Sequence, residues 1–94
     1  MNKVNQIIAF ISQETGVSVN DILSRSRKAN IVRARQLSMW LCRLTTEISQ
    51  QQIAYTHGCE RHATVIWAFN QVEDERSISQ SFKTLTNEYK AIFK

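Results

Sequence analysis

The sequence contains no proline and only two glycines, Gly16 and Gly58. Because proline and glycine are the residues that most often interrupt regular structure, their scarcity favours a chain of helices with few breaks. No apolar run approaches the roughly 18 residues that cross a membrane, and the first residues lack the layout of a cleavable signal peptide. We therefore expect a cytoplasmic protein with no membrane partner.

Cysteine and histidine are also scarce. The two cysteines, Cys42 and Cys59, lack the paired spacing of a zinc site, since Cys59 and His62 offer only one pair. His57 and His62 are the only histidines, and neither has a carboxylate or thiol arranged for catalysis. The Gly-x-x-x-x-Gly-Lys-Ser/Thr pattern of a phosphate-binding loop does not occur. We expect no metal, no cofactor, no bound nucleotide and no enzymatic activity.

The positive charge is unevenly distributed along the chain. Lys and Arg number 12 against eight Asp and Glu, and half of them lie in residues 22–46, which contain no acid. Such one-sided charge is the electrostatic footprint of a nucleic-acid partner, although a solvated helix face followed by a basic loop gives the same count. The six candidate contacts to phosphate are Arg25, Arg27, Lys28, Arg33, Arg35 and Arg43.

Apolar residues recur three and four positions apart along most of the chain, and no alternating strand pattern is present. This periodicity predicts a single all-α domain of about six helices over residues 1–94. Gly16 suits the end of the first helix, and Ser18 and Ser49 suit helix starts. The expected helices cover about residues 2–15, 18–24, 30–47, 49–57, 61–75 and 77–93, with a basic loop at residues 25–29 and Ser77 or Ser79 opening the last helix.

The expected core follows these helices. In the last helix five residues repeat at heptad-like spacing, which favours packing on the same domain but leaves a homodimer through this helix as an alternative. Those five residues are Ile78, Phe82, Leu85, Tyr89 and Ile92. The other expected core residues are Val4, Ile7, Ile8, Ile11, Ala34, Leu37, Trp40, Leu41, Leu44, Ile48, Ile53, Ala54, Val65, Ala68, Phe69 and Val72.

Residues 49–75 have the order of a helix-turn-helix: a short helix, a tight turn and a longer helix. Gly58 tolerates the positive φ of such a turn, and Ala54 supplies the small side chain that the helix crossing needs. The second helix of this motif enters the major groove by its N-terminal end. Arg61 there can pair with guanine, worth about 1–3 kcal/mol of discrimination. The other candidates at this end are His62, Ala63, Thr64 and Trp67.

Three stretches of the sequence form a recognisable set: residues 16–27, the run Arg33-Ala34-Arg35-Gln36, and Gly-Cys-Glu-Arg-His-Ala-Thr-Val at 58–65. Together they resemble the C-terminal DNA-binding domain, domain IV, of the bacterial replication initiator DnaA, which shows Gly-Gly-Arg-Asp-His-Ser/Thr-Thr-Val at the third stretch. The resemblance runs from about residue 4 to residue 75. It implies a Trp-repressor-like helix-turn-helix that binds double-stranded DNA, here as a stand-alone module without the family's ATP-binding part.

The resemblance also implies roles for matching positions. Arg27 matches a loop arginine that enters the minor groove in the family. Arg35, Gln36 and Arg43 match residues that contact phosphates, although the family has lysine at the position of Arg43. His62 and Thr64 match further DNA contacts of the family. These contacts position the protein on DNA without reading its sequence.

The base-reading positions differ from the family. Its Arg-Asp pair is Glu60-Arg61 here, Ala63 lacks the family's hydroxyl, and Trp67 and Gln51 replace a histidine and a proline. Since Arg61 cannot accept a hydrogen bond from cytosine as an aspartate does, we expect a preferred sequence other than the usual initiator box. The expected role is a nucleoid-associated regulator of transcription or of replication initiation.

A second interpretation makes the chain a protein-interaction module on the same fold, with DNA reading lost. Glu60 at the tip of the motif would repel phosphate, and an exposed Trp67 would anchor a protein partner. Trp67 could instead contact neither DNA nor a partner protein and pack against the last helix, as tryptophan is on average highly buried.

Overall fold

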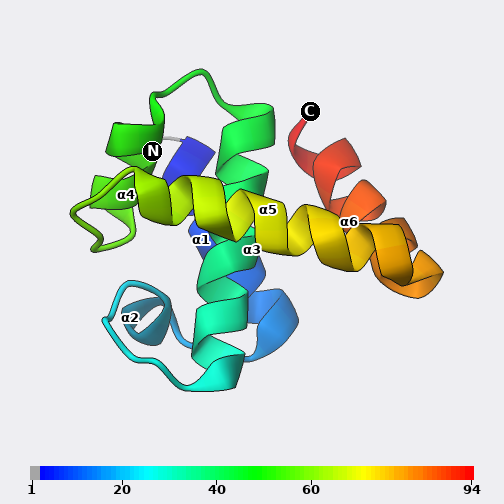
Figure 1. Cartoon of the computed structure of the whole chain (residues 1–94), viewed down its shortest axis with the longest axis horizontal. Helices are drawn as coiled ribbons and strands as arrows, with labels where there is room; N and C mark the ends of the chain where they lie inside the picture. Colours follow the sequence, from blue (N-terminus) through cyan, green and yellow to red (C-terminus); the bar gives the residue numbers. More distant parts are fainter. Residues whose placement is uncertain (1–2) are drawn as a thin grey trace.

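The computed structural model describes residues 3–94, and this part of the chain is six α-helices without a strand (Figure 1). The expectation of an all-α domain of about six helices is confirmed; the expected first helical residue, Asn2, lies outside the described residues. Across residues 3–94 no helix combines the length and apolar character that a membrane crossing requires. The helices are α1 (Lys3–Thr15), α2 (Val19–Ile22), α3 (Ala29–Thr45), α4 (Gln50–Thr56), α5 (Ala63–Ile78) and α6 (Gln80–Phe93).

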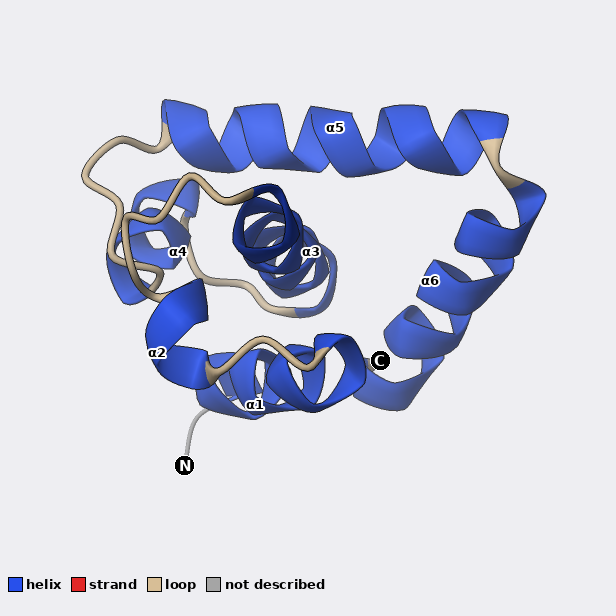
Figure 2. Ribbon diagram, turned by 90° about the horizontal axis from the view of Figure 1, so that it is seen from below, coloured by secondary structure: helices blue, strands red, loops and turns tan. Residues whose placement is uncertain are grey.

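Helix α3 is the centre of the molecule. Seen end-on, it lies between α1 and α5, with α2 and α4 on one side and α6 on the other (Figure 2). All six residues from Leu37 to Cys42 are buried, as expected of a helix that is surrounded rather than covered on one face. The prediction that Leu44 and Ile48 belong to the core was wrong. Leu44 and Ile48 are 39% and 37% exposed, because α3 ends at Thr45 and its neighbours cover only its earlier turns.

Serine hydroxyls begin three of the helices, as the sequence predicts for Ser18 and Ser49. The Oγ atoms of Ser18, Ser49 and Ser79 accept hydrogen bonds of 3.1–3.2 Å from backbone N–H groups three residues later. Each such cap satisfies one of the unpaired donors at a helix start, worth about 1 kcal/mol. Of the two serines considered for the last helix, Ser79 is the cap.

Helix α5 departs from the expected bounds at both ends. It begins at Ala63 rather than Arg61, and its N-cap residue His62 makes no side-chain capping bond. It ends at Ile78 rather than near Glu75, since Ser79 is the first residue with extended backbone and also caps α6. A single residue therefore joins α5 to α6.

The buried face of α6 differs from the expected heptad. Phe82 and Tyr89 are buried as expected, but Thr86 is the third buried residue of this helix. Leu85 and Ile92 are 40% and 59% exposed, and Ile78, 84% exposed, belongs to the end of α5. The prediction that Leu85 and Ile92 are buried was wrong, because the face of α6 that contacts the core contains Thr86, which takes part in a polar network.

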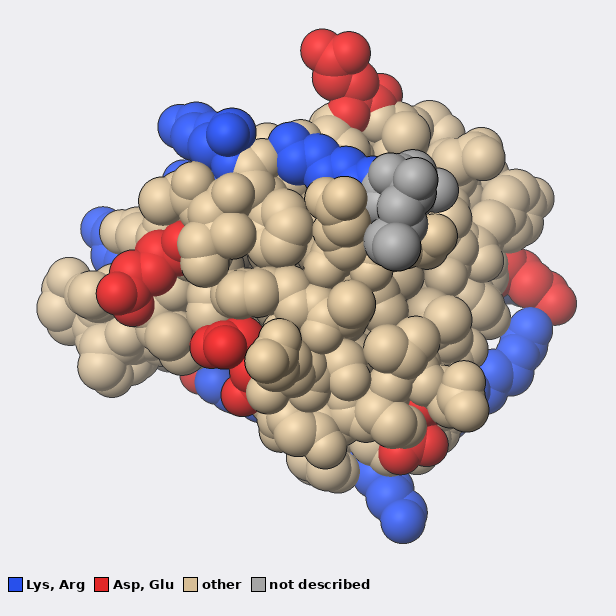
Figure 3. Space-filling view, turned by 180° about the vertical axis from the view of Figure 1, so that it is seen from behind, with Lys and Arg blue, Asp and Glu red and all other residues tan. Residues whose placement is uncertain are grey.

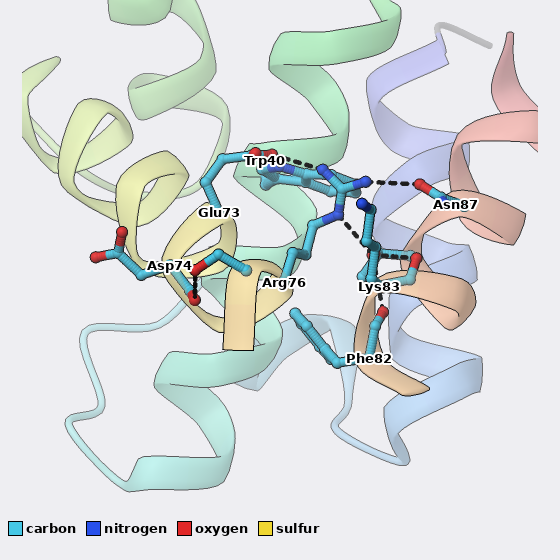
Figure 4. Close-up of polar contacts among 9 residues, drawn as sticks. Trp40, Glu73, Asp74, Arg76, Phe82, Lys83 and Asn87 are labelled. Atoms are coloured by element: carbon cyan, nitrogen blue, oxygen red, sulfur yellow. Dashed lines mark hydrogen bonds and ion pairs between the residues drawn. The ribbon is translucent and has the colours of Figure 1, made fainter. Parts of the chain in front are cut away.

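That network is centred on Arg76 of α5 (Figure 4). Its guanidinium donates hydrogen bonds to Glu73, Thr86 and Asn87 at 2.8, 3.0 and 2.6 Å, and the indole N–H of Trp40 donates to the same Glu73 oxygen at 2.7 Å. Burial alone would raise the pKa of Glu73, but these hydrogen bonds and the arginine charge outweigh burial and lower it. The network joins α3, α5 and α6.

Candidate nucleic-acid interface

The basic loop was expected at residues 25–29 and is the segment 23–28 between α2 and α3. Arg35 holds this segment in place. From α3, the Nε of Arg35 donates to the carbonyl oxygen of Ile22 at 2.8 Å, and Nη2 donates to that of Ser26 at 3.1 Å. Arg35 is half-buried, so these charge-assisted bonds are partly shielded from water. The resemblance implied a phosphate contact for Arg35; the structure adds that this residue shapes the loop carrying Arg25 and Arg27.

The turn of the helix-turn-helix contacts the basic loop directly. Gly58 has a φ of +76°, as the tight turn requires, and the N–H of Cys59 donates to the Ala54 carbonyl at 2.8 Å. A Cβ atom on Gly58 would lie 2.4 Å from the carbonyl oxygen of Leu23. Position 58 therefore requires glycine for two reasons: its backbone has a positive φ, and the basic loop approaches too closely to leave room for a Cβ atom. The expected burial of Ile53 and Ala54 is confirmed.

The loop and the turn together line a hollow of about 410 Å³. In Figure 1 the segment after α2 and the segment before α5 lie on the same side of the molecule. The structure thus brings together residues that are more than 30 positions apart in the sequence. The predicted contact residues that line this hollow are Arg25, Arg27, Arg35, Arg61 and Thr64.

Glu60 is paired rather than free at the edge of this hollow. Its Oε1 lies 3.0 Å from Nη2 of Arg25, and both side chains are largely exposed. The amide Nε2 of Gln51 donates to the backbone oxygen of Glu60 at 2.9 Å. Gln51, predicted as a base reader, therefore holds the backbone of the turn that precedes α5. Repulsion of phosphate by Glu60 was considered from the sequence, but its pairing with Arg25 was not.

The start of α5 is open to solvent. Arg61, His62, Ala63 and Thr64 are all exposed, and within residues 3–94 the side chain of Arg61 has no ion pair or hydrogen bond. Arg61 and His62 precede the first turn of α5 and lie at the N-terminal end of this helix.

Two further predicted phosphate contacts, besides Arg25 and Arg35, have partners inside the protein. Arg33 forms an ion pair with Glu75 and lies over the Phe82 ring, 5.0 Å from its centroid. Arg43, in the last turn of α3, lies 4.0 Å from the centroid of Phe69. A cation over an aromatic ring contributes about 0.5–1 kcal/mol at an exposed site, so both guanidinium groups are oriented by α5 or α6. Lys28 is the exposed N-cap residue of α3.

Trp67 lies one turn after Thr64 on α5. Its side chain is 57% exposed, which does not agree with the interpretation that it packs against the last helix. It lines hollows together with Arg27 and Gln36. The exposed ring therefore belongs to the same side of the molecule as the basic loop.

Comparison with known proteins agrees with this geometry. A family model described as the bacterial DnaA protein helix-turn-helix matches residues 4–72, which contain all but the first residue of α1, the whole of α2 to α4 and more than half of α5. The chain belongs to this DNA-binding helix-turn-helix family. The resemblance of residues 16–27 and 58–65 to DnaA is thereby confirmed.

Two relatives illustrate the similarity of this DnaA-type domain to longer proteins. The chromosomal replication initiator protein DnaA of Aquifex aeolicus is 37% identical over 83 residues, which cover 88% of this chain and 21% of the relative. That of Tropheryma whipplei (strain Twist) is 34% identical over 85 residues, 90% of this chain and 17% of the relative. The chain spans about a fifth of the length of these relatives.

Sequence reasoning missed one residue that positions the helix-turn-helix of this DnaA-type domain. His57, the last residue before the turn glycine, is fully buried. Its Nδ1 donates to the Ile53 carbonyl at 2.8 Å, and Nε2 accepts from the Ser38 hydroxyl of α3 at 2.7 Å. Burial lowers the pKa of His57 to about 4, so the imidazole is neutral at physiological pH. Only its place before Gly58 distinguished it in the sequence.

The neighbouring thiol is not activated. Burial raises the pKa of Cys59, and the nearby charges of Arg35 and Arg25 offset this only in part. Cys59 is therefore a protonated, half-buried thiol that packs against the core.

The face seen from behind carries charges of both signs. In that view Lys and Arg side chains lie at several places, with acidic side chains near some of them and uncharged side chains over most of the surface (Figure 3).

Proposed function

We propose that this chain binds double-stranded DNA sequence-specifically, with the start of α5 in the major groove and the basic loop in the adjacent minor groove. The observation that carries the proposal is the shared hollow in which Arg27 from the loop and Arg61 from the turn converge. Neither side chain has an ion pair within residues 3–94. Two unpaired guanidinium groups beside a helix N-terminus suit a polyanion that presents bases and phosphates together.

The residues around the hollow divide into two groups. Contacts that position the protein come from the loop and α3, and readers of the bases come from the start of α5. Because the readers differ from the family's Arg-Asp-His-Ser/Thr pattern, the preferred sequence differs from the usual initiator box. The proposed positioning residues are Arg25, Arg27, Lys28, Arg35, Gln36 and Thr64, with Arg33 and Arg43 at the periphery, and the proposed readers are Arg61, His62 and Ala63, with Gln51 behind them.

We assign this binding to the regulation of replication initiation or of transcription on the nucleoid. Its support is the family: the relatives with 34–37% identity are chromosomal replication initiator proteins.

Selection from random duplexes followed by fluorescence anisotropy tests the proposal. One motif should be enriched, and the affinity should fall steeply between roughly 50 and 200 mM salt, because each phosphate contact releases counterions. The proposal fails if no motif is enriched and the affinity is insensitive to salt.

A second candidate function is a protein-interaction module or a homodimer that uses Trp67 and α6. It is favoured by three exposed apolar residues seven positions apart: Ile78, Leu85 and Ile92. Sedimentation of Trp67→Ala and Leu85→Ser distinguishes the two functions. Loss of an oligomer or complex with unchanged DNA binding supports the interaction module.

A further inference from the structure

A second hollow, of about 450 Å³, lies between α3 and α5 beside Trp67. Its volume is within the range of about 300–1,000 Å³ that small-molecule and base-sized groups occupy in proteins. Its floor is apolar and consists of Val32, Met39 and Ala68. Met39 and Ala68 are almost completely buried, so the floor is a fixed part of the core.

The rim of this hollow, by contrast, is polar and basic. It is formed by Arg27, Arg35, Gln36 and Thr64, and no acidic residue lines the hollow. These four residues are among those to which the proposed function assigns positioning contacts to DNA, so the inference below rests on that function. A ligand that suits this hollow has a flat apolar part, which contacts the floor, and an anionic part, which contacts the rim.

The exposed indole of Trp67 supplies the remaining wall. A duplex presents only sugar and phosphate to a backbone-binding rim, because its bases are paired and stacked toward the helix axis. In a single strand the bases unstack and turn toward aromatic side chains. A basic groove with an exposed aromatic ring is the combination that proteins use to bind single strands.

We propose that this hollow is a binding site for an unpaired base of single-stranded DNA. The base stacks on Trp67 over the floor of Val32, Met39 and Ala68, and Arg27 holds the adjoining phosphate. Arg27 lines both this hollow and the one between loop and turn. Single-stranded and double-stranded DNA therefore share Arg27 and compete for the same side of the domain.

Titration with a fluorescein-labelled thymidylate strand of about 12 nucleotides, and with a duplex carrying the selected motif, tests this site. Because Trp40 is fully buried, quenching of tryptophan fluorescence by the strand reports on Trp67. We expect Trp67→Ala to abolish the quenching and to lower single-strand affinity about five- to hundredfold. Trp67→Phe retains most of the affinity, since its ring still stacks.

Tyr55→Ala is the matched control. Tyr55 is 61% exposed and is not among the residues that line the hollow, so its removal leaves single-strand affinity unchanged. If the wild-type domain binds the duplex but not the single strand, the site is overturned and the proposed function stands. If it binds neither, both are overturned. If Trp67→Ala binds the single strand as the wild type does, the placement of the base on Trp67 is wrong.

Discussion

Arg35 and Ile22 are joined by a hydrogen bond of 2.8 Å from the guanidinium Nε to the backbone carbonyl. The two residues are 13 positions apart, and the bond fixes the end of α2 to the middle of α3. A second bond from the same side chain reaches Ser26. Arg35 therefore determines where the loop places Arg27, in addition to any phosphate contact of its own.

Replacement of Arg35 tests this double role. Arg35→Ala should weaken binding to every duplex and lower the salt slope by about one. It should also lower the free energy of unfolding by about 2 kcal/mol, since hydrogen bonds from a charged donor contribute about 1.5–3 kcal/mol. Arg35→Lys keeps the charge but not the fork geometry, so it should restore the salt slope and not the stability. A lysine variant with wild-type stability would contradict the loop-holding role.

Replacement of Arg61 tests the placement of α5 in the major groove. Arg61→Ala should relax the preference at one base pair by about 1–3 kcal/mol, because a guanidinium pairs with the O6 and N7 of guanine. Random-site selection before and after the change measures this. Arg43→Ala, at the far end of α3, is the control and should leave the selected motif intact. An unaltered motif in Arg61→Ala would show that another side chain reads the groove.

We expect Glu60 to compete with DNA for Arg25, with which it forms an ion pair of 3.0 Å. In Glu60→Gln the guanidinium of Arg25 is released, so affinity for all duplexes should rise a few-fold and the salt slope should increase by about one. The double variant with Arg25→Gln identifies the cause. If release of Arg25 is responsible, the gain disappears in the Arg25→Gln background. An equal gain in both backgrounds would mean that Glu60 acts only through general repulsion of phosphate.

The two glycines offer a matched comparison. Gly16 and Gly58 have nearly the same positive φ, +77° and +76°, but a Cβ atom meets nothing at Gly16 and the Leu23 carbonyl at Gly58. Gly16→Ala should cost about 1–2 kcal/mol for the backbone conformation alone. Gly58→Ala should cost about 1–3 kcal/mol more, because the turn and the basic loop must separate. Urea denaturation measures both, and equal costs would contradict the close approach.

His57 makes the stability of the domain depend on pH. The pKa of His57 is about 4 in the folded protein, below its ordinary value of 6.5. Between these values the unfolded chain binds a proton that the folded one does not, so the free energy of unfolding falls as the pH falls from about 6.5 to about 4. The full loss is about 3 kcal/mol. Denaturation across this range should show this slope in the wild type and not in His57→Gln.

The helix-turn-helix was predictable because its determinants are local. Ser49 caps α4 by a bond to the backbone three residues later, and Gly58 can adopt a positive φ without steric cost. The family signature at residues 58–65 added the expected docking mode, which remains a proposal. By contrast, the buried face of α6 was predicted wrongly, because the hydroxyl of Thr86 is buried only once Arg76 of α5 is there to donate to it.

The sequence by itself determined the all-α architecture, the helix caps, the turn and the concentration of positive charge in residues 22–46. These follow from backbone preferences, apolar spacing and composition, which act over a few residues. Only the tertiary structure decided which arginines have partners within the protein. Arg33 is paired with Glu75, Arg25 with Glu60 and Arg35 with the backbone of the basic loop, while Arg27 and Arg61 line one hollow and have no ion pair within residues 3–94. Such pairings join residues from 9 to 42 positions apart, and they exist only when packing of α3 and α5 brings the loop and the turn together.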